Sequence, residues 1–300
     1  MDQALFFIMS LVHESLAFVR WPASSCHQVY KGRLRRRAEK IDKHINLSCS
    51  SKLVLAEAHG VTFTLNNSCS FTVWPGWLNG DGESVLEGGY KLDPSHSVQL
   101  SIPSGWGGRF WGRTGCQFDS SNRGSCETGD CGNGLYCKGS SGATPVTLVE
   151  IKLNGFSSKD FYDVSLVDGY NLPVRMYPLS SGCTNVGCHS DVNAVCPQEL
   201  QVRNSGGHVV ACKSACEAFQ TDAFCCRGNH STPQTCSPTL YSRLFKNDCP
   251  QAYSYAYDDL TSTFTCTSGG GYVIQFCPPG SFTKSRQHHG RARGHRRIGS

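Results

Sequence analysis

The stretch Cys126-Glu-Thr-Gly-Asp-Cys131-Gly-Asn-Gly-Leu-Tyr-Cys137 places three cysteines within twelve residues. It belongs to a set of sixteen cysteines between residues 60 and 280, out of eighteen in the 300-residue chain. Their spacings include C-x₄-C, C-x₅-C and an adjacent Cys225-Cys226 pair, and they lack the paired CxxC or CxxH knuckles of zinc sites. An even set of this density predicts disulfides in a secreted or lumenal protein, and no metal or other cofactor is expected.

The pairing of these cysteines is not determined by their spacing. Sixteen half-cystines allow roughly two million pairings. Cys225 and Cys226 point in opposite directions along an extended backbone, so each is expected to pair elsewhere. Bridges of roughly 2–4 kcal/mol each exceed what a domain of about 220 residues needs to fold, which suggests resistance to heat, acid and proteases. Cys26 and Cys49 lie outside the set and are expected to be unpaired, in a segment that is removed or does not fold.

Most of the body shows an apolar alternation of period two, which is typical of strands with one buried face. The runs that show it are Val61–Leu65, Val98–Ile102, Thr147–Leu153 and Tyr272–Phe276. Turn pairs separate them at Asn79-Gly80, Asp81-Gly82 and Asp168-Gly169. The pattern predicts a mainly β protein built as a β-sandwich.

Two helices are expected in a loop-bearing insertion of this sandwich. One covers Ser214–Gln220. The other opens with Ser237 as N-cap and Pro238 at the first helical position. Apolar pairs at i, i+4 spacing follow it, namely Leu240/Leu244 and Tyr241/Phe245.

The formal net charge of +5 is unevenly distributed. Residues 1–59 carry nine basic and five acidic side chains, and residues 281–300 carry six basic and no acidic side chains. Residues 60–280 carry 13 basic against 18 acidic side chains, a net charge of −5. The basic C-terminal run lacks aromatic residues for base stacking, and no apolar run reaches eighteen residues. Neither nucleic-acid binding nor a transmembrane helix is expected.

These differences divide the chain into three segments. Residues 1–59 are expected to be a signal-like, mis-spliced or disordered leader, with signal-like apolar stretches at Ala4–Val12 and Leu53–Gly60. Residues 60–280 form the functional domain, and nine cysteines between 183 and 249 mark 183–250 as a cysteine-rich insertion. Residues 281–300 are expected to be a basic, disordered tail.

The run Phe110-Trp-Gly-Arg-Thr-Gly-Cys116 lies just upstream of the opening stretch, and together they resemble the signature of thaumatin-like proteins, the plant pathogenesis-related family 5. The resemblance extends over nearly all of 60–280, and all sixteen cysteines have a counterpart in the family. Further shared stretches are Phe71–Trp74, Asp163–Asn171, Phe224–Cys226, Asp248–Tyr255 and Phe276–Pro278. One departure is Asn122, where the signature usually has glycine. The resemblance implies a flattened β-sandwich, a cysteine-rich second domain and a cleft between them.

The resemblance also implies a disulfide pairing. Its bridges would be Cys69–Cys277, Cys116–Cys126, Cys131–Cys137, Cys183–Cys266, Cys188–Cys249, Cys196–Cys212, Cys216–Cys225 and Cys226–Cys236.

In many members of this family one arginine and four acidic residues line the cleft. The matching positions here are Arg109, Glu150, Asp163, Asp168 and Asp258, although Asp259 adjoins the last and either could face the cleft. Carboxylates accept strong hydrogen bonds from sugar hydroxyls, and a guanidinium beside them offsets their repulsion. Aromatic rings that could stack on a sugar are Tyr170, Phe156 and Tyr255.

Each of these positions also has an ordinary structural interpretation. Asp168 precedes a glycine and fits a turn, Arg109 fits a strand-surface charge, and Asp258 fits a solvated loop. Asp163 and Asp168 are five residues apart, so in one regular strand they would face opposite sides. If both line one cleft, a bulge or a turn must separate them.

The resemblance implies a secreted, monomeric plant defence protein of the apoplast or vacuole that is antifungal and binds β-1,3-glucan or another cell-wall polysaccharide, with a fungal membrane as a further target. One alternative is a weak endo-β-1,3-glucanase with Glu150 as general acid and Asp163 as nucleophile or base. Another is an inhibitor of secreted microbial hydrolases. Sequons at Asn66 and Asn229 predict glycosylation in the secretory pathway.

Overall fold

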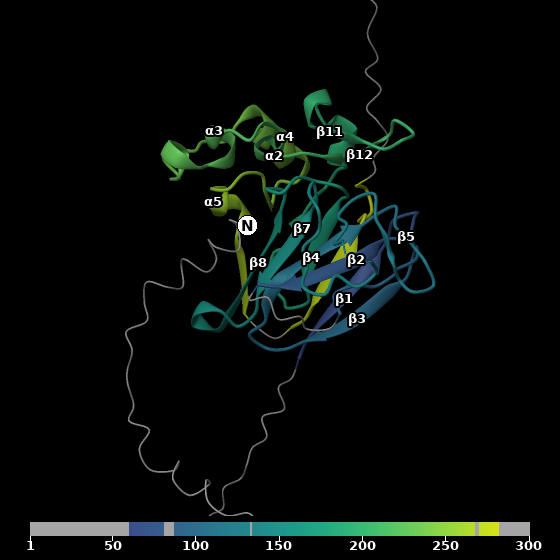
Figure 1. The fold of residues 1–300 in the computed structure, drawn as a ribbon. Helices are drawn as coiled ribbons and strands as arrows, with labels where there is room; N and C mark the ends of the chain where they lie inside the picture. Colours follow the sequence, from purple (N-terminus) through teal and green to yellow (C-terminus); the bar gives the residue numbers. More distant parts are fainter. Residues whose placement is uncertain (1–59, 81–86, 133, 268–269, 282–300) are drawn as a thin grey trace, which may run out of the picture.

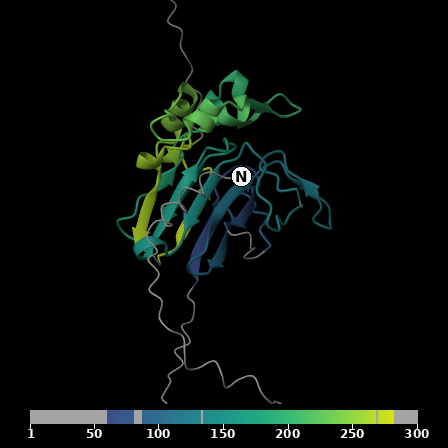
Figure 2. The same cartoon turned by 60° about the vertical axis from the view of Figure 1, so that its left-hand side comes forward.

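A computed structural model describes residues 60–80, 87–132, 134–267 and 270–281 of the chain. Within these ranges two large β-sheets lie together, and most of the helices gather at one end of both sheets (Figures 1 and 2). Some features predicted from the sequence lie outside the described residues, namely the leader, the basic tail, Cys26, Cys49 and the turn pair at residues 81–82.

The first sheet has five strands in the order β10-β9-β15-β1-β3. Neighbours run antiparallel except β1 and β15, which are parallel. Three of the predicted strands, at 61–65, 98–102 and 272–276, lie in this sheet, and their alternating apolar side chains are buried except for Val98, which is half-buried. The strands are β1 (Val61–Asn67), β3 (Ser97–Ile102), β9 (Val174–Pro178), β10 (Val186–Gly187) and β15 (Tyr272–Phe276).

The second sheet has six strands in the order β13-β8-β7-β4-β2, with β14 beside β8. The strand predicted at 147–153 is β7 of this sheet. Its strands are β2 (Trp74–Asn79), β4 (Gly107–Arg113), β7 (Leu148–Lys152), β8 (Lys159–Ser165), β13 (Ala252–Tyr253) and β14 (Phe264–Thr267). Two small antiparallel pairs complete the β structure, β5 (Gln117–Phe118) with β6 (Gly124–Ser125) and β11 (Gln201–Arg203) with β12 (Val209–Cys212).

An aromatic core joins the two large sheets. The ring of Phe63 in β1 stacks on Phe110 of β4 at 5.2 Å between centroids and on Tyr272 of β15 at 5.1 Å. All three side chains are fully buried. Such ring pairs contribute about 0.5–1.5 kcal/mol each beyond the burial of their area. The predicted β-sandwich is therefore confirmed.

The helices of the described ranges are short, and four of them are α-helices where the sequence predicted two. Together with the small β11–β12 hairpin, the α-helices form a lobe above the sheets (Figure 1). The α-helices are α2 (Ala215–Phe219), α3 (Asp222–Cys225), α4 (Leu240–Asp248) and α5 (Asp259–Ser262), and the 3-10 helices are η2 (Phe156–Ser158), η3 (Val192–Val195), η4 (Gln198–Leu200) and η5 (Gly228–His230). Among the described residues, no helix is long and apolar enough to cross a membrane.

The predicted helix starts are right in one case and wrong in the other. Ser214 caps α2 by accepting a hydrogen bond from the Glu217 amide, as expected for a helix over 214–220. In contrast, α4 begins at Leu240 with Thr239 as its N-cap, so Ser237 and Pro238 precede the helix.

The reason is a capping box at the start of α4. The Thr239 side chain accepts from the Ser242 amide, and the Ser242 side chain accepts from the Thr239 amide. The two apolar pairs expected on this helix do not both pack into the core. Phe245 of one pair is buried, whereas Leu240 of the other is 82% exposed.

Eight disulfides cross-link the described chain. They join Cys69–Cys277, Cys116–Cys126, Cys131–Cys137, Cys183–Cys266, Cys188–Cys249, Cys196–Cys212, Cys216–Cys225 and Cys226–Cys236, which are the pairs that the resemblance implies. The adjacent cysteines bond to different partners, as their opposite directions require. Three of the bridges lie within residues 196–236 and hold the lobe together.

Asn122, which stands where the family signature usually has glycine, occupies a left-handed turn. Its φ is +60°, and its amide donates to the Asp119 carbonyl at 2.9 Å. Asparagine tolerates this conformation better than most residues, so the replacement keeps the turn.

Candidate functional site

Three of the five predicted site residues form a row across the second sheet. Arg109 of β4 lies opposite Glu150 of β7, and Glu150 lies opposite Asp163 of β8. Directly opposed residues point to the same face, with Cβ atoms about 4.5–5.5 Å apart. Strand pairing alone therefore brings these three side chains together.

The row points away from the core of the sandwich. Val149 and Ile151, on either side of Glu150, are part of the apolar core, as are Tyr162 and Val164 on either side of Asp163. Because side chains alternate along a strand, the acidic residues between them face the opposite side of the sheet. They are buried nonetheless: Arg109 is 7%, Glu150 1% and Asp163 0% exposed.

Asp163 is in an unfavourable place for a charged carboxylate. Neither of its carboxylate oxygens has a hydrogen-bond partner among the described residues. Burial raises the pKa of Asp163 well above its usual value, and the nearby charges of Glu150 and Asp259 raise it further. The protonated form of Asp163 is thus favoured.

Asp258 and Asp259 are adjacent at the start of α5, and Asp259 is the one whose charge acts on Asp163. The phenol of Tyr253 donates to Asp259 Oδ1 at 2.8 Å. Burial, followed by the charge of Asp163, raises the pKa of this phenol, so Tyr253 stays protonated. Tyr253 therefore connects Asp259 with the surroundings of Asp163.

Asp258, the residue that the resemblance selects, is held inside the lobe. Its Oδ2 forms an ion pair with Lys246 Nζ at 2.9 Å and accepts from the amide and the hydroxyl of Ser254. Its Oδ1 accepts from the Thr261 hydroxyl at 2.9 Å. These contacts tie α4, the 254–258 loop and α5 to one another, so the role of Asp258 within the lobe is structural.

Asp168 lies in a turn that separates it from the strand carrying Asp163. β8 ends at Ser165, and the amide of Gly169 donates to the Leu166 carbonyl at 3.0 Å. Gly169 has a φ of +86°, which favours glycine. The turn removes the constraint of strand alternation, and it places Asp168 at the end of the sheet that faces the lobe.

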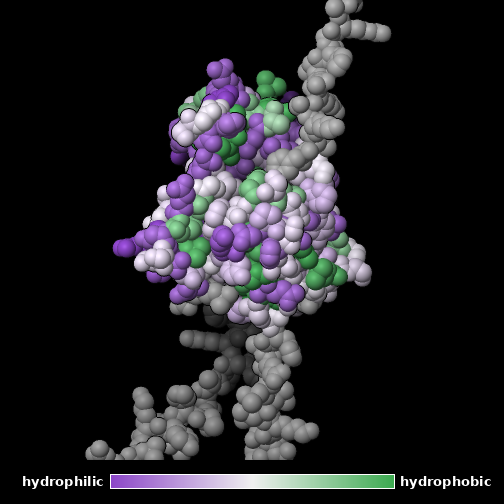
Figure 3. Space-filling model, turned by 90° about the vertical axis from the view of Figure 1, so that its right-hand side faces the viewer, coloured by the Kyte–Doolittle hydropathy of each residue, from purple (hydrophilic) through white to green (hydrophobic). Residues whose placement is uncertain are grey.

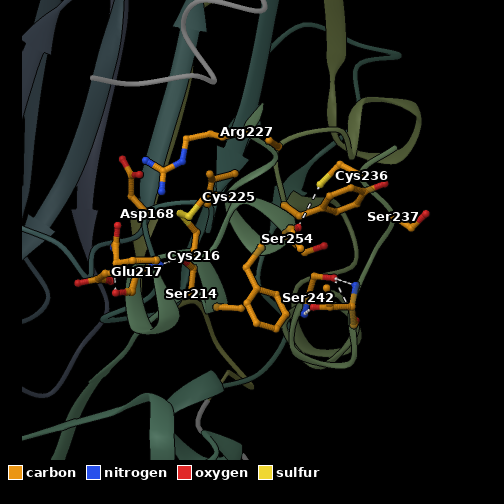
Figure 4. Close-up of a pocket in the computed structure, with 18 of the residues that line it drawn as sticks. Asp168, Ser214, Cys216, Glu217, Cys225, Arg227, Cys236, Ser237, Ser242 and Ser254 are labelled. Atoms are coloured by element: carbon orange, nitrogen blue, oxygen red, sulfur yellow. Dashed lines mark hydrogen bonds between the residues drawn. A yellow bond between two sulfur atoms is a disulfide. The ribbon is translucent and has the colours of Figure 1, made fainter. Parts of the chain in front are cut away.

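A cavity of about 260 Å³ lies where this turn meets the lobe. Thr144 and Asp168 line it from the β body, while Glu217 of α2, Arg227 and Tyr255 line it from the lobe. Figure 4 shows the Arg227 guanidinium directed toward Asp168, with Glu217 among the other lining residues. Figure 3 shows the lobe standing above the β body, with hydrophilic residues over much of its visible face.

Of the predicted cleft residues, only Asp168 lines this cavity. The sequence did not identify Glu217 and Arg227 as residues that line this cavity. Glu217 has the spacing of a helix-capping residue after Ser214, and Arg227 only follows a cysteine pair. The three aromatic candidates differ: Tyr170 is fully buried, Phe156 is 63% exposed at the opposite end of β8, and Tyr255 lines the cavity.

A second cavity, of about 470 Å³, contains none of the predicted site residues. It lies between the start of β2 at Trp74, the 171–173 segment and the start of η3 at Asp191. Its walls include Phe71 and Val209. No group of three or more His, Cys, Asp or Glu side chains in the described ranges is placed to hold a metal ion.

The fold and the acidic groups define a disulfide-stapled β-sandwich with a cysteine-rich lobe. The thaumatin family matches residues 67–278, and the chain belongs to this family. It is 57% identical over 224 residues to pathogenesis-related thaumatin-like protein 3.5 of Cryptomeria japonica, covering 74% of this chain and 91% of the relative. It is 59% identical over 218 residues to pathogenesis-related protein 5 of Arabidopsis thaliana, covering 72% and 90%.

A further relative carries an enzyme name. A protein of Prunus avium called glucan endo-1,3-beta-glucosidase is 48% identical over 225 residues, covering 74% of this chain and 92% of the relative. The eight disulfides and the membership of the thaumatin family are consistent with folding in the secretory pathway.

Proposed function

We propose that this protein is a secreted plant defence protein that binds β-1,3-glucan of fungal walls at the cavity between the β body and the lobe. The single observation that carries the proposal is the lining of this cavity. Asp168 and Glu217 offer carboxylate acceptors, Arg227 offers donors, and Tyr255 offers a ring. Sugar hydroxyls both donate and accept hydrogen bonds, so this mixture suits a neutral saccharide.

Exposure favours this cavity over the buried row as the sugar-binding surface. Asp163 and Glu150 are 0% and 1% exposed, so a polysaccharide cannot touch them without displacing their cover. Asp168 and Glu217 are half-buried and line open space. The relatives named as pathogenesis-related proteins support a role in defence.

Co-sedimentation with insoluble β-1,3-glucan tests this proposal. The full chain, produced in an oxidising secretory host, is expected to pellet with β-1,3-glucan and to remain in solution with cellulose, whose β-1,4 linkage is the matched control. Equal recovery in the two supernatants would remove the proposed function.

The second candidate function is a weak endo-β-1,3-glucanase, which the name of the Prunus avium relative favours. Glu150 and Asp163 are opposed on adjacent strands, so their carboxyl groups lie side by side on one face of the sheet, and glycosidases use a pair of carboxyl groups. The raised pKa of Asp163 favours its protonated form, which suits a general acid, whereas the sequence suggested Asp163 as nucleophile or base.

Release of reducing ends from soluble β-1,3-glucan tests the enzymatic candidate. Hydrolysis that disappears in both Asp163→Asn and Glu150→Gln would support it. Hydrolysis that survives in both variants would assign the activity to other groups or to a contaminant.

The hydrolase-inhibitor alternative and the action on a fungal membrane rest on the family resemblance alone. The same is true of the apoplastic or vacuolar location and of the monomeric state.

A further inference from the structure

The cavity between the β body and the lobe has two walls, and the family resemblance accounts for only one of them. Asp168 stands on the β body, while Glu217 and Arg227 belong to the cysteine-rich lobe and are not among the residues that the resemblance selects. The chemistry of this second wall decides what the cavity can bind.

Glu217 reaches across the cavity to the β body. The hydroxyl of Thr144 donates to its Oε1 at 3.0 Å, although 73 residues separate the two in sequence. At the start of α2 its amide is bound by the Ser214 side chain. Contacts at both ends of the residue therefore fix where its carboxylate lies.

Holding the Glu217 carboxylate in this cavity beside Asp168 costs folding free energy. Burial raises the pKa of Glu217, and the charge of Asp168 raises it further, against the opposing effect of the Thr144 hydrogen bond and the Lys213 charge. Two half-buried acidic groups close together weaken the fold. Such an arrangement is typical of functional sites, where ligand donors offset the cost.

Arg227 supplies the complementary donors. It directly follows Cys225 and Cys226, each of which is bonded to a different cysteine, so the backbone before it is held by two bridges. Figure 4 shows its guanidinium directed toward Asp168, and Glu217 lines the same cavity. A guanidinium has five N–H donors in a planar fork, and those not used by carboxylates can reach a ligand oxygen.

We propose that Glu217 and Arg227 are ligand-binding residues, and that this cavity takes a single sugar unit of a β-1,3-linked glucan between them and Asp168. This inference rests on the proposed function and names the second wall of its site. The volume of about 260 Å³ lies just below the range of about 300–1,000 Å³ of ordinary small-molecule pockets, which fits a single sugar ring. Tyr255 provides an aromatic surface in the same cavity.

Calorimetric titration of the full chain with laminaribiose, the β-1,3-linked glucose disaccharide, tests this inference. Glu217→Gln and Arg227→Gln are each expected to weaken binding roughly tenfold, because each removes a charge-assisted hydrogen bond. Glu199→Gln and Arg203→Gln are matched controls in the same lobe, since both residues are exposed and lie outside the cavity lining. They are expected to leave the affinity within about twofold.

The outcomes separate this inference from the proposed function. If the chain pellets with insoluble β-1,3-glucan while Glu217→Gln and Arg227→Gln bind laminaribiose like the wild type, this inference is wrong and glucan binding lies elsewhere. If the wild type binds neither the polymer nor the disaccharide, both are wrong. Glutamine at 217 keeps an acceptor for Thr144, and near-UV circular dichroism of each variant shows whether a loss of binding comes from a loss of fold.

Discussion

Asp163 of β8 lies directly opposite Glu150 of β7, and both side chains are almost entirely buried. Two carboxyl groups at opposed positions repel each other when both are charged, and burial adds a desolvation cost. Asp259 places a third acidic group within range of Asp163. The fold thus keeps an arrangement that lowers its own stability, and the eight disulfides offset such a cost.

Replacement of Asp163 by asparagine is expected to stabilise the protein at neutral pH. The folded-state pKa of Asp163 is raised, so the folded state binds a proton that the unfolded state has already lost. The stability that this group contributes is fully present below the ordinary aspartate pKa and is lost as pH rises through the raised folded-state pKa. Asp163→Asn removes this loss, since asparagine does not ionise.

Thermal melts of the wild type and Asp163→Asn at pH 4 and pH 8 measure the effect. We expect the variant to gain at least about 1 kcal/mol at pH 8, or roughly 2–4 °C in Tm, and much less at pH 4. Glu127→Gln, at an exposed position, is the control and is expected to change neither value. A variant that melts lower than the wild type at pH 8 would show that the charged form of Asp163 is stabilising.

The ion pair between Lys246 and Asp258 is expected to hold the lobe together. The ammonium of Lys246 also donates to the Ala252 carbonyl at 2.9 Å and to the Ser262 hydroxyl at 2.8 Å. Lys246→Met leaves a half-buried carboxylate without its cation, so we expect a loss of about 2–3 kcal/mol in the free energy of unfolding, below the 3–5 of a fully buried pair.

A double-mutant cycle with Asp258→Asn measures this coupling by denaturant unfolding. The double variant is expected to recover part of the loss, giving a coupling energy of at least about 1 kcal/mol. Additive losses would mean that the two side chains do not act as a pair. Asp258→Asn alone is expected to change stability more than glucan affinity.

Of the two predicted glycosylation sequons, Asn229 is the one expected to be modified. Asn229 is exposed in η5 of the lobe, whereas Asn66 lies within β1 and is paired with Ser97 on one side and Gln275 on the other. Mass spectrometry of protein from a glycosylating secretory host should show a glycan that Asn229→Gln removes and Asn66→Gln leaves in place. A glycan that persists in Asn229→Gln would contradict this assignment.

The sequence predicts four strands, in which apolar residues occupy every second position. The alternating runs at 61–65 and 272–276 are strands of the first sheet, but β4 has almost every residue buried and shows no alternation to detect. The start of α4 was ambiguous for a different reason. Ser237 and Thr239 are both good N-caps, and the reciprocal bonds with Ser242 decide between them.

Candidate site residues can be predicted from the family resemblance, but their surroundings cannot. Asp258 and Asp259 are neighbours in sequence, and only the position of Lys246 on α4 shows which of them is held within the lobe. Glu217 and Arg227 reach Asp168 from elements about 50 to 60 residues away in the sequence, and no local pattern connects them.

The central claim is that saccharide contacts are made by the open cavity rather than by the buried acidic row. The most direct test compares the affinity of Asp168→Asn and Asp163→Asn for soluble β-1,3-glucan with that of the wild type. We expect Asp168→Asn to bind roughly tenfold more weakly, through loss of a charge-assisted acceptor, and Asp163→Asn to bind within about threefold of the wild type. Loss of binding in Asp163→Asn together with unchanged binding in Asp168→Asn would contradict the claim.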